Sequence, residues 1–129
     1  MALIVADTDV LIDFLTGREP AGSQVEQALT TGDLRTTAIS RFELLSGAKT
    51  ARQLRMIRRL LAVVGALRLD DAAADQAAAV RRSLERRGRG IGMGDSLIAG
   101  IVLATGAVLL TRDRRHFERV EGLELAEPA

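Results

Sequence analysis

Four acidic residues stand at the ends of predicted structural elements: Asp7, Glu43, Asp95 and Asp113. In open α/β sheets, binding sites form outside the carboxyl ends of the strands, so these carboxylates could converge on one rim. Carboxylates a few ångströms apart repel each other or raise each other's pKa values. A hard divalent cation such as Mg²⁺ or Mn²⁺ removes that conflict, because both prefer carboxylate and water oxygens. Such a site can activate water for attack on phosphorus and neutralise charge on a phosphate.

The elements that must position these acids are short apolar runs that alternate with helical patterns. Strands are predicted at 2–6, 34–37, 66–69, 107–110 and, as an edge strand, 123–125. Helical spacing is found at 9–15, 21–29, 39–48, 54–64, 70–84, 97–102 and 114–119. This alternation predicts an α/β fold in which helices cover both faces of a mostly parallel central sheet. Asp7 then directly follows the first strand, and Asp113 closely follows the fourth.

Each acid also has an interpretation without chemistry. Asp7, together with Asp9, could cap the first helix, and Asp95 could favour the positive end of its own helix. Asp113 could be a turn residue. Glu43 fits this kind of interpretation less well, because apolar residues surround it in the predicted helix.

The composition limits the class of protein. The chain has 129 residues, of which 47% are hydrophobic, so one domain spanning 1–129 is expected. It contains no cysteine, which excludes disulfides, thiolate zinc sites and a cysteine nucleophile. The longest uncharged run, Ser96 to Thr111, is shorter than the roughly 20 apolar residues that a membrane span needs. Too few residues precede Asp7 for a signal peptide, so we expect a cytoplasmic protein without a membrane anchor.

Four segments of the chain together resemble a known family. They read VADTDVLIDFL, AISRFELLSGA, GMGDSLIAG and LLTRDRRHF, and each contains one of the four acids. In this order they resemble the acidic motifs of the PIN-domain ribonucleases, specifically the toxins of VapBC-type toxin–antitoxin pairs. The resemblance covers essentially the whole chain and implies a PIN-like three-layer α/β/α sandwich.

The resemblance also implies roles for individual side chains. The acidic site would consist of four residues: Asp7, Glu43, Asp95 and Asp113. Asp7 and Asp95 would bind the metal, Mg²⁺ or Mn²⁺, directly, and the other two acids would complete the pocket and position water. Thr111 resembles the hydroxyl neighbour of the metal in that family. Asp9 stands where the family often has asparagine or serine, so it is interpreted as an accessory residue that also caps the first helix.

Two further polar residues are expected to lie outside the site. Asp13 lies a full turn beyond Asp9 and matches no acid of the family, which predicts a solvated helix residue. His116, the single histidine, is expected to pack beside Phe117 or to lie on the surface, without a catalytic role. A general acid or base must reach the scissile group, and nothing in the sequence places His116 there.

The reaction implied by the resemblance is hydrolysis of an RNA phosphodiester bond by metal-activated water, without a covalent enzyme intermediate. Members of this family are usually homodimers, and a cognate antitoxin inhibits them by covering the acidic groove with its tail. The resemblance therefore implies an RNA substrate, an antitoxin and a second copy of the chain as partners. The apolar helix face at 54–64 could serve the antitoxin contact, although packing in the core is the default interpretation.

Arginine supplies nearly all of the positive charge. The net charge is only +1, but 17 of the 18 basic residues are arginines, whose planar guanidinium suits phosphate. A genome rich in G and C would produce the same bias. One basic run leads into the segment that contains Asp95: Arg82, Arg86, Arg87 and Arg89. These side chains are candidates for binding RNA phosphates, and a solvated helix face is the alternative.

Two other classes of protein compete with this interpretation. The segment DTDVL approaches the aspartate motif of haloacid dehalogenase-like phosphatases, in which the first aspartate is a phosphorylated nucleophile. That family normally needs a basic residue in its site, and Lys49, the single lysine, stands in the wrong context. The other alternative is a non-catalytic PIN-like binding or scaffold module, because a fold alone does not fix a function. The presence of all four acids argues against it.

Overall fold

A computed structural model describes residues 3–127 as a sheet of five strands with seven helices. The strands are β1 (Ile4–Ala6), β2 (Leu34–Thr37), β3 (Gly65–Leu67), β4 (Val108–Leu110) and β5 (Glu124–Leu125). The helices are α1 (Thr8–Thr16), α2 (Ala21–Thr31), α3 (Ala38–Gly47), α4 (Ala51–Val63), α5 (Asp71–Arg86), α6 (Met93–Thr105) and α7 (Arg114–Phe117). Every predicted element is present in the described range, with bounds that differ by a few residues; Ala2, the predicted start of the first strand, lies outside that range. None of the helices in the described range is long and apolar enough to span a bilayer.

The sheet places β1 at its centre. Its strand order is β3-β2-β1-β4-β5, and each of the four pairings is parallel. From β1 the chain first builds one half of the sheet, through β2 and β3, and then returns to build the other half beside β1. The order of the strands therefore reverses between β1 and β4, which is where open α/β sheets form binding crevices at their carboxyl edge.

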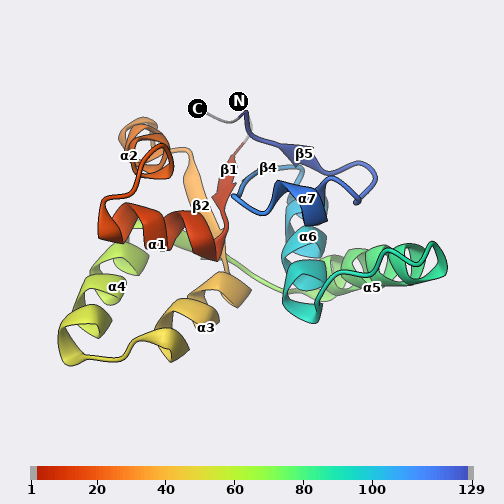
Figure 1. The fold of residues 1–129 in the computed structure, drawn as a ribbon, viewed down its shortest axis with the longest axis horizontal. Coiled ribbons are helices and arrows are strands. Elements are labelled where there is room, and N and C mark those ends of the chain that lie inside the picture. Colours follow the sequence, from red (N-terminus) through yellow and green to blue (C-terminus); the bar gives the residue numbers. More distant parts are fainter. Residues whose placement is uncertain (1–2, 128–129) are drawn as a thin grey trace.

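Helices cover both faces of this sheet, which confirms the three-layer α/β/α prediction. Neighbouring residues of one strand point to opposite faces, and Val5 and Ala6 of β1 accordingly belong to two different buried clusters. Leu109 and Leu110 of β4 divide in the same way. Figure 1 shows α1 to α4 on one side of β1 and β2, with α5 and α6 on the other. Strands buried on both faces explain why the sequence showed apolar runs rather than alternation.

Side-chain caps fix where several helices begin. Thr37 accepts a hydrogen bond from the backbone N–H of Ser40 at the start of α3. Asp70 caps α5 by accepting a hydrogen bond from the backbone N–H of Ala73. Helix α4 begins at Ala51, earlier than the predicted 54, because Thr50 caps it. The apolar pattern alone missed this first turn, since its residues are exposed.

Helix α6 lies directly against α5 at Gly100. A Cβ atom at this position would lie 2.5 Å from the carbonyl oxygen of Ala73, so only glycine allows the two backbones to approach this closely. The first turn of α6 contains Asp95. The close contact between the helices therefore helps to fix where that carboxylate stands at the edge of the sheet.

Candidate active site

The candidate site lies at the carboxyl ends of the central strands. Asp7 directly follows β1, caps α1 and is buried, with only 6% of its surface exposed. Its Oδ1 accepts a hydrogen bond from the backbone N–H of Thr8 at 2.8 Å. Its Oδ2 accepts a hydrogen bond from the hydroxyl of Thr111, which follows β4, at 2.7 Å. The two strands on either side of the switch in strand order are thus joined through one carboxylate.

Thr111 also connects this carboxylate to the next acid. Its Oγ1 accepts the backbone N–H of Asp113 at 3.0 Å while its own proton is donated to Asp7. The sequence analysis expected Thr111 beside a metal. The structure shows it hydrogen-bonded to one predicted site residue and to the backbone of another.

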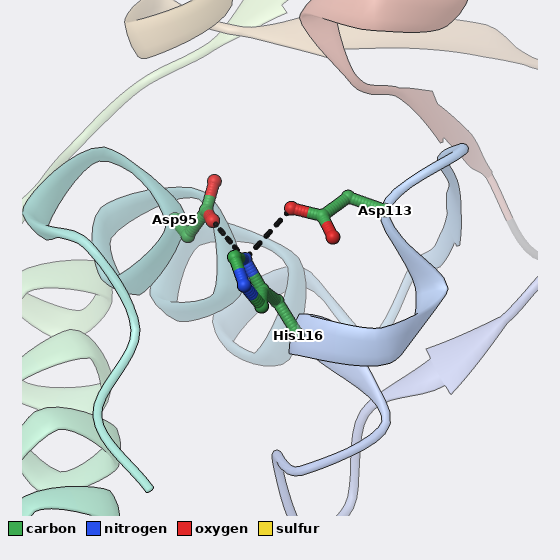
Figure 2. Close-up of side chains that lie close together, drawn as sticks. All are labelled: Asp95, Asp113 and His116. Carbon is green, nitrogen blue, oxygen red and sulfur yellow. Dashed lines mark hydrogen bonds and ion pairs between the residues drawn. The ribbon is translucent and has the colours of Figure 1, made fainter.

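Asp113 and Asp95 meet around the imidazole of His116. Its Nδ1 lies 2.8 Å from Oδ2 of Asp113 and 3.3 Å from Oδ2 of Asp95. Figure 2 shows the ring between the two carboxylates, with Asp95 coming from α6 and Asp113 from the segment before α7. The half-exposed His116 does lie at the surface, as predicted, but its contact with both acids was missed. The spacing of three residues from Asp113 on a short helix was the available signal.

Glu43 joins the site through the first residue of α1. Its Oε1 lies 2.6 Å from the hydroxyl oxygen of Thr8, which is also 2.8 Å from the hydroxyl oxygen of Ser40. Its Oε2 lies near Gly94, where a Cβ atom would be 3.5 Å from it. Thr8 and Ser40 were not predicted as site residues, because the contact joins helices that are distant in the sequence.

All four predicted acids therefore belong to one connected arrangement, although they are not equally close. Within residues 3–127, the group whose potential metal-binding atoms all lie within 4.8 Å of one another consists of Asp95, Asp113 and His116. Asp7, one of the two predicted metal ligands, is outside this group and is joined to it through Thr111. Glu43 is joined through Thr8.

Burial sets the ionisation of Asp7. It raises the pKa of this carboxyl from 3.8 to about 7, and the nearby charge of Asp9 adds to the rise. The hydrogen bonds from Thr111 and Thr8 oppose it, because they stabilise the ionised form. Asp7 is therefore a carboxylate whose negative charge the protein itself does not fully compensate.

Two other acids share this property. Burial raises the pKa of Asp95, with Asp113 and Glu43 adding to the rise and His116 opposing it. Burial also raises the pKa of Asp9, one of whose carboxylate oxygens is buried without a hydrogen-bond partner among residues 3–127. A crowded set of oxygen donors with raised pKa values fits a hard divalent cation, which would stabilise the ionised forms.

Two acids on α1 contact the segment between Thr111 and Asp113. Asp9 Oδ2 accepts the backbone N–H of Arg112 at 3.1 Å, and Asp13 Oδ2 lies 2.8 Å from Nε of the same arginine. The prediction that Asp13 is a solvated helix residue is wrong, since it is buried and ion-paired. Asp9 lies near the site as expected, but the helix cap is Asp7 and not Asp9.

The predicted arginine run lies at and beyond the end of α5, which extends away from the sheet in Figure 1. All four side chains are exposed: Arg82, Arg86, Arg87 and Arg89. The guanidinium of Arg87 donates a hydrogen bond to the carbonyl oxygen of Arg119 at 3.1 Å. A contact between this run and RNA stays a prediction.

The chain is similar to known proteins over nearly its whole length. The family model described as "PIN domain" matches residues 4–123. The chain is 32% identical to the tRNA(fMet)-specific endonuclease VapC of Shigella flexneri, over 95% of this chain and 96% of that protein. It is 33% identical to Ribonuclease VapC10 of Mycobacterium tuberculosis, over 95% and 91% respectively. The structure of DNA-bound VapBC from Salmonella typhimurium superposes with a TM-score of 0.87 at 28% identity, covering 98% of each chain.

We predict that the stability of the metal-free protein falls as the pH rises from about 4 to about 7. The folded protein binds the proton of Asp7 more tightly than the unfolded chain, so this contribution is complete at low pH and is lost above the folded pKa. Asp7→Asn removes it. In a chelator at pH 8, the variant should melt higher than the wild type by roughly 5 °C, with a smaller difference at pH 4.

Thermal melts followed by circular dichroism at both pH values measure this difference. Asp75→Asn, at an exposed position on α5, is the control and should melt like the wild type. An Asp7→Asn variant that is destabilised equally at both pH values would contradict the prediction.

We also predict that Asp13→Asn loosens the segment around Arg112 without unfolding the protein. The substitution keeps the size of the side chain and removes the ion pair, at a cost of about 1 kcal/mol in the free energy of unfolding. Amide hydrogen exchange of Arg112 and Asp113 should accelerate several-fold. Glu85→Gln, which removes the exposed ion pair with Arg81, should leave both amides unchanged. Equal exchange in the two variants would show that Asp13 does not fix this segment.

Proposed function

The chain belongs to the PIN-domain family, and we propose that it is a metal-dependent endoribonuclease toxin that is inhibited by a cognate antitoxin. The observation that carries the proposal is the continuous set of contacts that links Glu43, Asp7, Asp113 and Asp95 at the carboxyl edge of the sheet. The VapC relatives named as endonuclease and ribonuclease support the same activity.

In this proposal some of the acids bind the metal and others orient water or accept a proton. Asp7 and Asp95 hold Mg²⁺ or Mn²⁺, which supplies Lewis-acid activation of water and neutralises charge on the phosphate when bound. Glu43, whose Oε1 is held by Thr8, orients water through Oε2. Asp113 accepts a proton and is itself hydrogen-bonded to His116, which is half exposed and can exchange that proton with solvent. Water forms a new bond to phosphorus and gives up a proton, one P–O ester bond breaks, and the departing RNA oxygen takes up a proton from solvent, so no covalent enzyme intermediate forms.

The proposal also includes a specific RNA substrate. The relative from Shigella flexneri is named as specific for tRNA(fMet), so that tRNA is the first candidate substrate for this chain. Phe42 is the one aromatic side chain that is largely exposed among residues 3–127, so base stacking contributes little and recognition depends mainly on shape and phosphate contacts.

This chain has a groove beside Glu43 that is suited to docking of the antitoxin. A groove of about 490 Å³ lies between α1, α3 and α4 and includes Ile12, Leu44 and Met56 together with Glu43. We call it the α1/α3/α4 groove. The helix face at 54–64 packs mainly in the core, as its default interpretation stated, because Ile57, Leu60 and Leu61 are buried there. Only the edge of that face is available, and it forms one wall of the groove. An amphipathic helix of the antitoxin fits such an apolar groove.

We expect Asp7→Asn and Asp95→Asn each to reduce RNA cleavage by at least roughly 100-fold, because each removes a negative charge from the acidic site. Purified, antitoxin-free protein is incubated with total cellular RNA and with tRNA(fMet), in Mg²⁺, in Mn²⁺ and in a chelator. Discrete fragments that require the metal and disappear in both variants are the expected result. Asp75→Asn on α5 should cleave like the wild type.

Two outcomes would contradict the proposal. Unchanged cleavage in both site variants would show that these acids do not form the catalytic site. Folded wild-type protein that cleaves no RNA in either metal would favour a non-catalytic PIN-like binding module. We also propose that the chain forms a homodimer, and light scattering of the same preparation measures its oligomeric state.

For the antitoxin contact, we expect Ile12→Glu to weaken inhibition while cleavage by the free toxin is retained. Ile12 is 44% exposed and lines the groove, so a charge there opposes docking of an apolar helix face. Titration of cleavage with the cognate antitoxin should need at least tenfold more antitoxin. Val63→Glu, at a 72% exposed position of α4 outside the groove, is the control. Equal inhibition of both variants would exclude the groove as the docking surface.

A further inference from the structure

Basic residues are concentrated in one stretch of the chain. Between Glu43 and Asp70 there is no acidic residue, and there are six basic ones: Lys49, Arg52, Arg55, Arg58, Arg59 and Arg68. The rest of the chain holds 12 basic and 17 acidic residues, so it carries a net charge of −5 against +6 for this stretch. Such a separation creates a local positive potential that the overall charge of +1 conceals.

Helix α4 presents four of these side chains to solvent on one face. Ile57, Leu60 and Leu61 are buried in the core, and the arginines occupy the opposite side of the helix. All four are exposed, and none forms an ion pair or a side-chain hydrogen bond with any part of residues 3–127. We call this surface the α4 arginine face, and it consists of Arg52, Arg55, Arg58 and Arg59.

Three of these arginines share a hollow that adjoins the α1/α3/α4 groove. Arg52, Arg55 and Arg59, spaced three and four residues apart, line a depression of about 350 Å³ together with Met56. Arg52 also lines the α1/α3/α4 groove, which contains Glu43. A strand held in the hollow can therefore continue along the groove toward the acids.

The chemistry of the hollow favours phosphate over a protein partner. Guanidinium groups bind phosphate through paired N–H donors, and three of them within two helical turns suit consecutive phosphates of a backbone. A protein interface needs an apolar centre, but in the described part of the chain Met56 is the single apolar side chain of the hollow. The buried apolar residues of α4 are already used in the core, and the exposed Val63 does not line the hollow.

The predicted run near the end of α5 is less suited to the same task. Glu85 lies within it, and its carboxylate is paired with Arg81 at 2.8 Å. Arg87 is hydrogen-bonded to a backbone carbonyl oxygen of another segment. On α4 no carboxylate competes for the arginines.

From these observations we propose that the α4 arginine face binds the RNA phosphate backbone and delivers the strand to the acidic site. This inference rests on the proposed ribonuclease function, to which it adds the surface that holds the substrate. The acids at the site repel RNA, and a positive surface at one side supplies the attraction that they lack.

The test uses the full chain with Arg55→Gln and Arg59→Gln combined. Arg52 is left unchanged, because it also lines the groove proposed for the antitoxin. Binding is measured in an Asp95→Asn background, so that RNA is not cut, with a labelled single-stranded RNA and with total tRNA. The expected result is roughly tenfold weaker binding, and a salt dependence whose slope is smaller by about 1.4, since each phosphate contact on single strands contributes about 0.7.

The control combines Arg18→Gln and Arg81→Gln, which changes the net charge equally at exposed positions away from α4. It should bind RNA like its parent protein. In the cleaving background, the α4 variant should show a raised KM with little change in kcat, because the acids are untouched. A third variant, Arg82→Gln with Arg86→Gln, should lose less affinity than the α4 variant.

Three results would overturn the inference. The first is an α4 variant whose affinity and salt slope match those of its parent. The second is a larger loss in the Arg82 and Arg86 variant, which would assign RNA binding to the end of α5. The third is unchanged RNA binding with loss of affinity for a polyglutamate peptide, which would assign the face to an acidic protein. Failure of the proposed function is seen separately, as absent cleavage by the wild type.

Discussion

The buried carboxylate of Asp7 is the feature on which the rest of the site depends. Its hydrogen bond with Thr111 joins the exits of β1 and β4, where the order of the strands reverses. The same hydroxyl accepts the backbone N–H of Asp113, so the position of a second acid follows from the first. Because burial raises the pKa of Asp7 to about 7, the fold places an under-compensated negative charge at its central edge. A bound cation would compensate this charge, and a bound metal ion can promote the hydrolysis of phosphodiesters.

A site of this kind faces an electrostatic conflict with its own substrate. The acids that bind a cation also repel the RNA polyanion that is to be cleaved. A basic surface along the path of the RNA offsets this repulsion. The chain separates the two requirements in space, with acids at the carboxyl edge of the sheet and, on α4, arginines that have no ion pair within residues 3–127. The nearly neutral overall charge is therefore the sum of two opposed regions and not a sign of an uncharged surface.

Sequence patterns predicted the elements and the four acids because both depend on local information. Strands buried on both faces give apolar runs, and residues that follow such runs lie at the edge of the sheet. The contacts of His116 and Asp13 could not be predicted in this way. Asp13 is buried and paired with Arg112, which lies on a segment distant in the sequence. His116 reaches Asp95 only because α7 folds back toward the start of α6.

Asp7 and Asp13 show how the structure separates roles that the sequence leaves equivalent. Asp7 caps α1 and Asp13 lies within it, and both are buried, but within residues 3–127 an arginine is paired with Asp13 and not with Asp7. That pair neutralises Asp13 and leaves it no need for a cation, whereas Asp7 receives only hydrogen bonds from neutral donors. The burial of an acid is therefore not enough to identify a metal ligand. What distinguishes the two is whether the chain supplies the compensating charge, and this becomes visible only when distant segments are brought together.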